Sequence, residues 1–234
     1  MKILQVITSL EMGGAETLVV NLILRLQALG YTVDLCVFNG IDTPLMQKLK
    51  RESPNTTIYT LGRGVYNPFY ILKLAKIMRG YDIIHTHNSS PQLFVAIANL
   101  FTRRKLVSTE HNTSNRKRNW KWYAPIESWM YRQYGHIICI SEIAEMKLRD
   151  YMGGDWLNKE SSIYNKISTI NNGVDVKAIS NALPDAELLS LKKDRKAILM
   201  VAGFRNQKDQ DTVVKALNIL DKEKFEVWFA GIGD

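Results

Sequence analysis

Short apolar runs alternate with longer amphipathic stretches along the chain. The strand candidates are 2–8, 32–38, 56–60, 82–86, 105–109, 136–140 and 167–171. Between them, the spacing of apolar residues predicts helices over 15–29, 43–52, 67–80, 89–102, 123–133 and 142–150. Several strands lack inside/outside alternation, which is typical of strands covered by helices on both faces. The pattern predicts an α/β fold with a doubly wound, mostly parallel sheet.

Two of the predicted helices carry additional signals. The helix over 15–29 has leucines at three- and four-residue spacing, which predicts an apolar stripe: Leu18, Leu22, Leu26 and Leu29. Gly30 follows and is expected to terminate this helix. Asn88 and Ser89 stand at the start of the helix over 89–102. Side chains of these types cap helix N-termini, so we expect them to cap this one.

The alternation weakens over 151–165 and again over 176–194, where charged and small residues dominate. We expect 1–175 to form a Rossmann-like domain, 176–194 a linker and 195–234 the beginning of a second unit. That unit would contain a strand at 196–202, a helix at 207–221 and a strand at 225–230. Three elements are too few to bury a sheet on both faces. The second Rossmann-like unit is therefore expected to be incomplete.

Composition limits the possible partners and cellular compartment of the protein. The 31 Lys and Arg residues against 23 Asp and Glu give a formal charge of +8. This excess favours an anionic partner such as nucleic acid, acidic lipid or a phosphorylated ligand, although a basic protein without such a partner is the alternative. Cys36 and Cys139 lie in apolar runs and are expected to be buried thiols, and the N-terminus reads as a strand rather than a signal peptide. No apolar run approaches the ~20 residues of a membrane span. We expect a cytoplasmic protein.

Glycines follow the first strand. Gly13 and Gly14 would let the backbone approach a ligand, and the helix behind them would offer free N–H groups to a phosphate. A plain strand-to-helix turn is the alternative. The dinucleotide-binding pattern G-x-G-x-x-G is absent, which removes the main support for a nicotinamide or flavin cofactor.

Histidines follow the fourth and fifth strands. His85 and His87 form an H-x-H pair, for which a metal site is conceivable, but no cluster of further ligands completes it. We therefore expect no metal, a site role for His87 and a core position for His85. His111 could hydrogen-bond a substrate, with Glu110 orienting it, or it could be an ordinary loop residue.

Cations and aromatic rings are interleaved after the fifth strand. The residues of this basic–aromatic segment are Arg116, Lys117, Arg118, Trp120, Lys121 and Trp122. Such a composition suits an anionic membrane interface or single-stranded nucleic acid, and a solvated loop with packed tryptophans is the alternative. No nucleic-acid-binding module is recognisable, so we expect no nucleic-acid partner. Further along, Arg205 and Lys208 follow the strand at 196–202, where cations could neutralise a diphosphate.

Together these segments resemble family 4 of the retaining glycosyltransferases, the glycogen synthase and capsular polysaccharide type, which has the two-Rossmann GT-B fold. The resemblance rests on KILQVITSLEMGGAETLVVNL, YDIIHTHNS, STEHN, IICISE, INNGVD, VAGFRNQKDQDTVVKAL and FAGIGD, in this order along the whole chain. It implies that His111, Arg205 and Lys208 are catalytic. Arg205 would stand in for an arginine that the family has at the position of Gly203. The resemblance also implies substrate-binding roles for Gly13, Gly14, His87, Asn112, Ser141, Glu142 and Asn172.

The resemblance implies transfer of a sugar from a nucleoside diphosphate sugar to a glycan or lipid-linked acceptor in surface polysaccharide (capsule) biosynthesis. It implies retention of configuration and no cofactor. The basic–aromatic segment adds the expectation of peripheral contact with an anionic membrane at the inner face. The family's E-x₇-E donor segment would lie beyond residue 234, so we expect residues 1–234 by themselves to be inactive. A non-catalytic acceptor- or membrane-binding module is one alternative, and a sugar-nucleotide epimerase of the same fold is another.

Overall fold

The computed structural model describes residues 1–112, 116–192, 194–204, 208–231 and 233. The chain divides into two compact units, Met1–Gly173 and Val174–Asp234. The first boundary therefore lies two residues before the expected end of the first domain at residue 175. Each unit is described by itself below.

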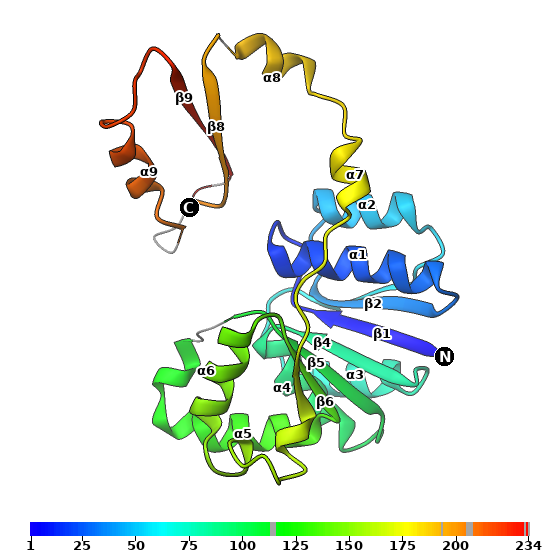
Figure 1. Ribbon diagram of the computed structural model, residues 1–234. Coiled ribbons are helices and arrows are strands. Elements are labelled where there is room, and N and C mark those ends of the chain that lie inside the picture. The colour runs from blue at the N-terminus through cyan, green and yellow to red at the C-terminus, as the bar shows by residue number, and fades with distance from the viewer. Residues whose placement is uncertain (113–115, 193, 205–207, 232, 234) are drawn as a thin grey trace. The chain divides into compact units, whose positions relative to one another are not determined.

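The first unit is built on a seven-stranded sheet. Its strands are β1 (Lys2–Ile7), β2 (Thr32–Asn39), β3 (Ile58–Gly62), β4 (Ile83–His87), β5 (Lys105–Glu110), β6 (His136–Cys139) and β7 (Ile167–Thr169). They lie in the order β3-β2-β1-β4-β5-β6-β7, and every neighbouring pair is parallel. The predicted doubly wound parallel sheet is confirmed (Figure 1).

Helices connect these strands. They are α1 (Gly14–Ala28), α2 (Pro44–Glu52), α3 (Phe69–Met78), α4 (Ser89–Asn99), α5 (Ala124–Gln133) and α6 (Glu142–Met152). Short 3-10 helices supplement them: η1 (Arg116–Asn119), η2 (Lys121–Tyr123), η3 (Gly154–Trp156) and η4 (Tyr164–Lys166). In Figure 1, α1 and α2 cover one face of the sheet, and α3, α4 and α5 cover the other. This two-faced cover explains the near-continuous apolar strands.

Two apolar clusters form the core, one on each face of the sheet. One joins Ile3 and Ile7 of β1 to α1 and α2, and the other joins Leu4 and Val6 of the same strand to the helices of the opposite face. In α1 the fully buried residues are Val19, Val20 and Ile23, whereas Leu29 is 72% exposed. The leucine stripe is therefore only partly confirmed: Leu26 packs against this core, Leu18 and Leu22 are half-buried, and Leu29 is exposed. The apolar residues of α1 spread around much of its circumference, and the contact with the sheet selects the β-branched side.

The order of the strands places a reversal between β1 and β4. From β1 the chain adds β2 and β3 on one side, and β4 then starts the other side. Parallel strands of this order leave a crevice beyond the carboxyl ends of the two central strands, because the connecting helices there turn to opposite faces. The segments after β1, β4 and β5 therefore gather at one edge.

The second unit contains a parallel pair, β8 (Lys196–Val201) and β9 (Phe225–Ala230), with α9 (Gln210–Ala216) between them. The predicted linker carries two short helices, α7 (Val176–Ser180) and α8 (Ala186–Leu191). Gly231, which directly follows β9, packs against the backbone that follows β8. A Cβ added at Gly231 would lie 1.9 Å from the carbonyl oxygen of Ala202. Over the described parts of both units, no helix has the length and apolarity to cross a membrane.

Candidate functional site

A chain of hydrogen bonds links three strands at the reversal of strand order. His87, at the end of β4, lies 3.0 Å through Nδ1 from Nε2 of His111, which follows β5. The other nitrogen of His87, Nε2, lies 2.8 Å from the side-chain oxygen of Gln5 on β1. Gln5 and His87 are fully buried, and His111 is partly exposed. The two histidines that the sequence singled out as site residues thus form one arrangement.

The third histidine of this group stands beside the chain of hydrogen bonds. The ring of His85 is centred 4.3 Å from that of His87, and the rings of His87 and His111 are 5.3 Å apart. Nε2 of His85 lies 2.8 Å from the hydroxyl of Thr109. His85 is buried, so it occupies a core position as the sequence predicted.

All three imidazoles are held in the neutral form. Burial lowers the pKa of His85 to about 3, with a smaller contribution from His111. Burial also lowers the pKa of His87 well below its ordinary value, and it lowers the pKa of His111 to about 4. A buried cation would lose its hydration without gaining a counter-ion here. Near neutral pH the group therefore offers lone pairs and N–H donors rather than positive charge.

The backbone is strained next to His87. Asn88 has φ 70° and ψ 149°, close to a region that glycine alone adopts easily. It is the N-cap of α4, but its side chain makes no capping hydrogen bond, so the predicted capping role is not observed. The conformation turns the chain sharply between β4 and α4, which leaves His87 at the edge of the sheet.

The glycine turn lies at the same edge, between β1 and α1. Gly13 is the N-cap of α1 with extended backbone, and Gly14 is the first residue of the helix. Around Gly14 an added Cβ would meet nothing within 4 Å, whereas at Gly13 it would meet the carboxylate of Glu16. The first N–H groups of a helix have no partners within the helix, so they can bind an anion.

Helix α6 begins directly after β6. Ser141 is its N-cap, and its hydroxyl accepts a hydrogen bond from the amide of Ala144 at 3.2 Å. Glu142, the first residue of the helix, is exposed. The structure therefore gives Ser141 a capping role and leaves Glu142 at the surface.

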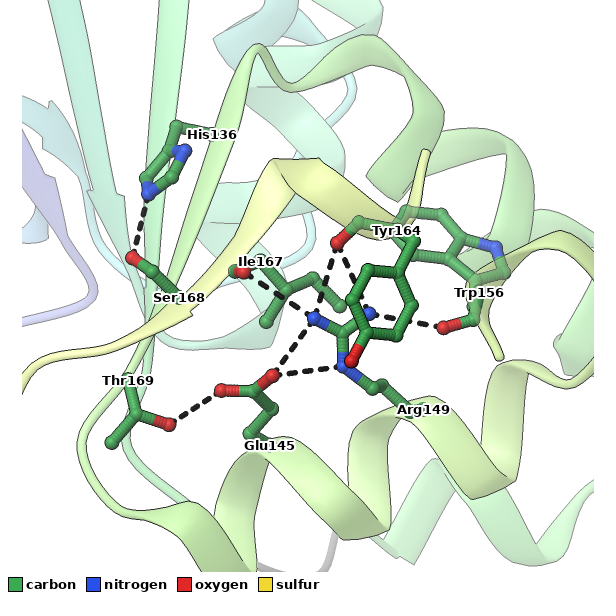
Figure 2. Close-up of polar contacts among 8 residues, drawn as sticks. All are labelled: His136, Glu145, Arg149, Trp156, Tyr164, Ile167, Ser168 and Thr169. Carbon is green, nitrogen blue, oxygen red and sulfur yellow. Dashed lines mark hydrogen bonds and ion pairs between the residues drawn. The ribbon is translucent and has the colours of Figure 1, made fainter. Parts of the chain in front are cut away.

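Arg149 holds this helix against the last strand of the sheet (Figure 2). Its guanidinium lies 2.8 Å from Glu145 and donates to the carbonyl oxygens of Trp156, Tyr164 and Ile167 at 3.0 to 3.3 Å. Figure 2 also shows the ring of Tyr164 against the guanidinium, whose carbon lies 3.7 Å from the ring centroid.

The carboxylate of Glu145 extends this group to β7. It accepts a hydrogen bond from the hydroxyl of Thr169 at 2.5 Å, and His136 lies 2.7 Å from the hydroxyl of Ser168 on the same strand (Figure 2). The irregular segment between α6 and β7, where the sequence pattern weakened, is thus fixed by polar contacts. The contacts also fix the position of α6 and hence of its first turn.

Glu110 does not orient His111, contrary to the expectation from the sequence. Its carboxylate accepts a hydrogen bond from Tyr131 and lies 3.5 Å from Arg118. Arg118 also contacts Glu127 at 3.4 Å, and its side chain is only 9% exposed. Opposite charges pair here because each would otherwise be buried alone. The charge of Arg118 is therefore engaged inside the protein and does not belong to an exposed basic surface.

The rest of the basic–aromatic segment presents rings to the solvent. Trp120 and Trp122 are 49% and 64% exposed, and their rings are stacked with centroids 5.5 Å apart. Nζ of Lys117 lies 5.5 Å from the ring centroid of Tyr66 and 5.6 Å from that of Tyr123. The backbones of Arg116 and Lys121 lie in η1 and η2.

The remaining predicted site residues make no contact that the structure assigns to the histidines, or fall outside the described residues. Asn112 follows His111 and is exposed, as is Asn172 near the end of the first unit. Lys208 is exposed in the second unit, whereas Arg205 falls outside the described residues. Within the described parts of the chain, no group of three or more His, Cys, Asp and Glu side chains is arranged to hold a metal ion.

Gln5 is the residue that sequence reasoning missed. It lies among apolar residues in the predicted first strand, and its partner His87 is 82 positions away. A single polar side chain in an otherwise apolar buried strand was the available signal, because buried polar groups are nearly always hydrogen-bonded.

The comparisons with solved structures concern the fold. HepE from Anabaena, in complex with UDP and glucose, has a TM-score of 0.79 and 16% identity, covering 100% of this chain and 62% of that one. The lipopolysaccharide outer core galactosyltransferase WaaB has a TM-score of 0.58 and 14% identity, and the match covers 98% of this chain and 60% of that one. The UDP-GlcNAc 2-epimerase from Methanocaldococcus jannaschii has a TM-score of 0.58 and 14% identity, and the match covers 98% of this chain and 65% of that one. The chain thus spans less than two thirds of the length of these proteins.

The comparison with protein families is more specific. No curated protein matches the sequence. The model of Glycosyltransferase Family 4 matches residues 12–178, which include the glycine turn, both site histidines and the start of α6. This match covers more than half of the chain, and the structural neighbours share the Rossmann-like GT-B architecture. The chain belongs to Glycosyltransferase Family 4.

Proposed function

We propose that this protein transfers a sugar from a nucleoside diphosphate sugar to a glycan or lipid-linked acceptor, with retention, in surface polysaccharide biosynthesis. The observation that carries the proposal is the His87–His111 pair at the reversal of strand order, at the same edge of the sheet as the glycine turn before α1. Ligands of such sheets bind beyond the carboxyl ends of the strands at this point. HepE, the neighbour with a TM-score of 0.79, has been solved with UDP and glucose. A UDP-sugar is therefore the donor to test first.

In this reaction the main task of the protein is to stabilise the negative charge that develops on the leaving group. The bond between the anomeric carbon and the diphosphate oxygen breaks, an acceptor hydroxyl oxygen bonds to that carbon, and the hydroxyl proton passes to the departing diphosphate. Negative charge develops on the departing diphosphate, where preorganised donors are most effective. We assign this task to Lys208, Arg205 and the amides at Gly13 and Gly14, without a metal ion or further cofactor. His111 would hydrogen-bond the reacting sugar.

The test is release of UDP from UDP-glucose in the presence of a polyprenyl-diphosphate-linked sugar. In the complete protein, Arg205→Ala combined with Lys208→Ala should lower kcat on the order of a hundredfold. Lys215→Ala, an exposed cation on α9, is the matched control and should leave turnover unchanged. Full turnover in the double variant would remove the assigned role. An inverted linkage in the product, read by NMR of the anomeric proton, would contradict retention.

The exposed tryptophans favour a second candidate function, membrane or acceptor binding without catalysis. Indole rings at the surface beside cations suit the headgroup region of an anionic bilayer. Trp120→Ser with Trp122→Ser should weaken sedimentation with phosphatidylglycerol vesicles, and Leu29→Ser, another exposed apolar position, should not. Equal binding by both variants would refute this surface. Vesicle binding without any sugar transfer would favour the module over the enzyme.

A further inference from the structure

The proposed function gives Gln5 no task, yet this side chain is fully buried at the reversal of strand order. The side-chain carbonyl oxygen of Gln5 faces Nε2 of His87, and the amide Nε2 of Gln5 has no hydrogen-bond partner among the residues that the structure describes. Leaving a buried amide donor unpaired is costly. Such a residue in an apolar strand calls for an explanation beyond packing, since a leucine or methionine of similar size would fill the space without this cost.

The direction of the hydrogen bonds follows from the oxygen of Gln5. An amide oxygen can only accept, so Nε2 of His87 carries the proton and donates it. A neutral imidazole has one N–H, which leaves Nδ1 of His87 with a lone pair. Nδ1 of His87 lies 3.0 Å from Nε2 of His111 and accepts a hydrogen bond from it, so Nε2 of His111 carries a proton. His111, also neutral, then has its proton on Nε2 and a lone pair on Nδ1.

Nδ1 of His111 is the open end of this chain. Among the described residues it has no hydrogen-bond partner, and His111 is the one member of the group that is partly exposed. His85 does not enter the chain, because its Nε2 is engaged with Thr109. The tautomer of the partly exposed ring is thus set from within the sheet, by the fully buried Gln5.

We propose that Gln5 is a positioning residue which, through His87, holds His111 in the Nε2–H tautomer, so that His111 presents Nδ1 as a hydrogen-bond acceptor to a hydroxyl of the bound sugar. The assignment of the ligand rests on the proposed function, whereas the tautomer does not. The opposite orientation of the Gln5 amide would reverse every hydrogen bond in the chain. His111 would then present an N–H donor, which suits a phosphate or carbonyl oxygen rather than a hydroxyl proton.

Nitrogen-15 NMR of the histidine side chains tests the tautomer directly, because protonated and unprotonated ring nitrogens resonate far apart. Near neutral pH, His111 of the native protein should show an unprotonated Nδ1 and a protonated Nε2. In Gln5→Met the chain loses its acceptor, so the two signals of His111 should move towards each other as the tautomers mix. A protonated Nδ1 in the native protein, or unchanged signals in Gln5→Met, would overturn the proposal.

Two controls separate this effect from a general loss of packing. Gln92→Met makes the same substitution at a buried glutamine that bonds Ser108 instead of a histidine. Thr109→Val breaks the contact of His85 and leaves the chain of hydrogen bonds intact. Both should preserve the signals of His111. If Gln5→Met fails to fold, the spectrum of the native protein still shows in which direction the hydrogen bonds of the chain run.

Turnover supplies a second readout and separates this proposal from the proposed function. In the complete protein, Gln5→Met should lower kcat about tenfold or more with little change in KM for the donor, as when a partner that orients an imidazole is lost. Native kinetics in this variant would overturn the positioning role. A fixed His111 tautomer in a protein without sugar transfer would instead refute the proposed function alone.

Discussion

At the scale of single residues, the backbone at Asn88 combines a conformational cost with a position in the site. Its φ of 70° is unfavourable for a residue with a Cβ, and its side chain gains no capping hydrogen bond in return. The residue connects His87 to the first turn of α4, where Lys117 contacts Ser89 at 3.4 Å. The surrounding contacts therefore hold Asn88 in a conformation that its own preferences oppose.

We expect Asn88→Gly to raise the free energy of unfolding by about 0.5–1 kcal/mol, because glycine adopts this conformation without strain but loses more entropy on folding. Asn88→Ala keeps the strain and should lower the free energy of unfolding. Urea denaturation of both variants is the measurement. A loss of stability in Asn88→Gly comparable to that in Asn88→Ala would show that the asparagine side chain has a structural task.

At the scale of elements, arginines on two helices show how burial changes the contribution of an ion pair. Arg149 of α6 is buried and satisfies three backbone carbonyls besides Glu145. Arg132 of α5 pairs with Asp155 at 3.4 Å, but both side chains are about half exposed. Water competes for the second pair and screens it, whereas removal of Arg149 would leave a carboxylate and several carbonyls without a partner.

Arg149→Met should therefore lower the free energy of unfolding by about 3–5 kcal/mol. The matched change Arg132→Met should cost about 0–1 kcal/mol. Denaturation followed by near-ultraviolet circular dichroism suits the comparison, because the buried Trp156 lies beside the guanidinium of Arg149. Equal effects of the two substitutions would contradict the role given to Arg149.

At the scale of the whole molecule, the neutral histidines couple stability to pH. The folded pKa values of His85 and His111 are lowered to about 3 and about 4, whereas unfolded histidine titrates near 6.5. Below about pH 6.5 the unfolded chain therefore binds more protons than the folded protein. The contribution of these residues is fully present above pH 6.5, and it is lost as the pH falls towards 4 and then 3.

The free energy of unfolding should accordingly fall between pH 7 and 4.5. His85→Gln removes one of the protons taken up on unfolding, so its pH dependence should be shallower by about 1 kcal/mol per pH unit. Urea denaturation at a series of pH values measures both slopes. The net positive charge of the chain affects the two proteins similarly, so parallel curves would contradict the burial of His85 as a neutral ring.

The class of fold, and the edge of the sheet proposed for the site, follow from the sequence. Apolar periodicity is a local property, and the alternation of strands and helices follows from it. His87 and His111 could each be placed at this edge, although not in contact, because the carboxyl ends of parallel strands share one edge. The family resemblance rested on the same short segments and is confirmed over residues 12–178.

Tertiary structure alone decided which side chains meet. The pairing of His87 with Gln5 spans 82 positions and its pairing with His111 spans 24, so no local pattern could reveal either. Arg118 was assigned to an exposed surface by its basic neighbours, but the buried carboxylates of Glu110 and Glu127 draw it inside. A buried charge or amide is stable only beside its partner. The fold, by bringing distant partners into contact, therefore determines where each polar residue lies.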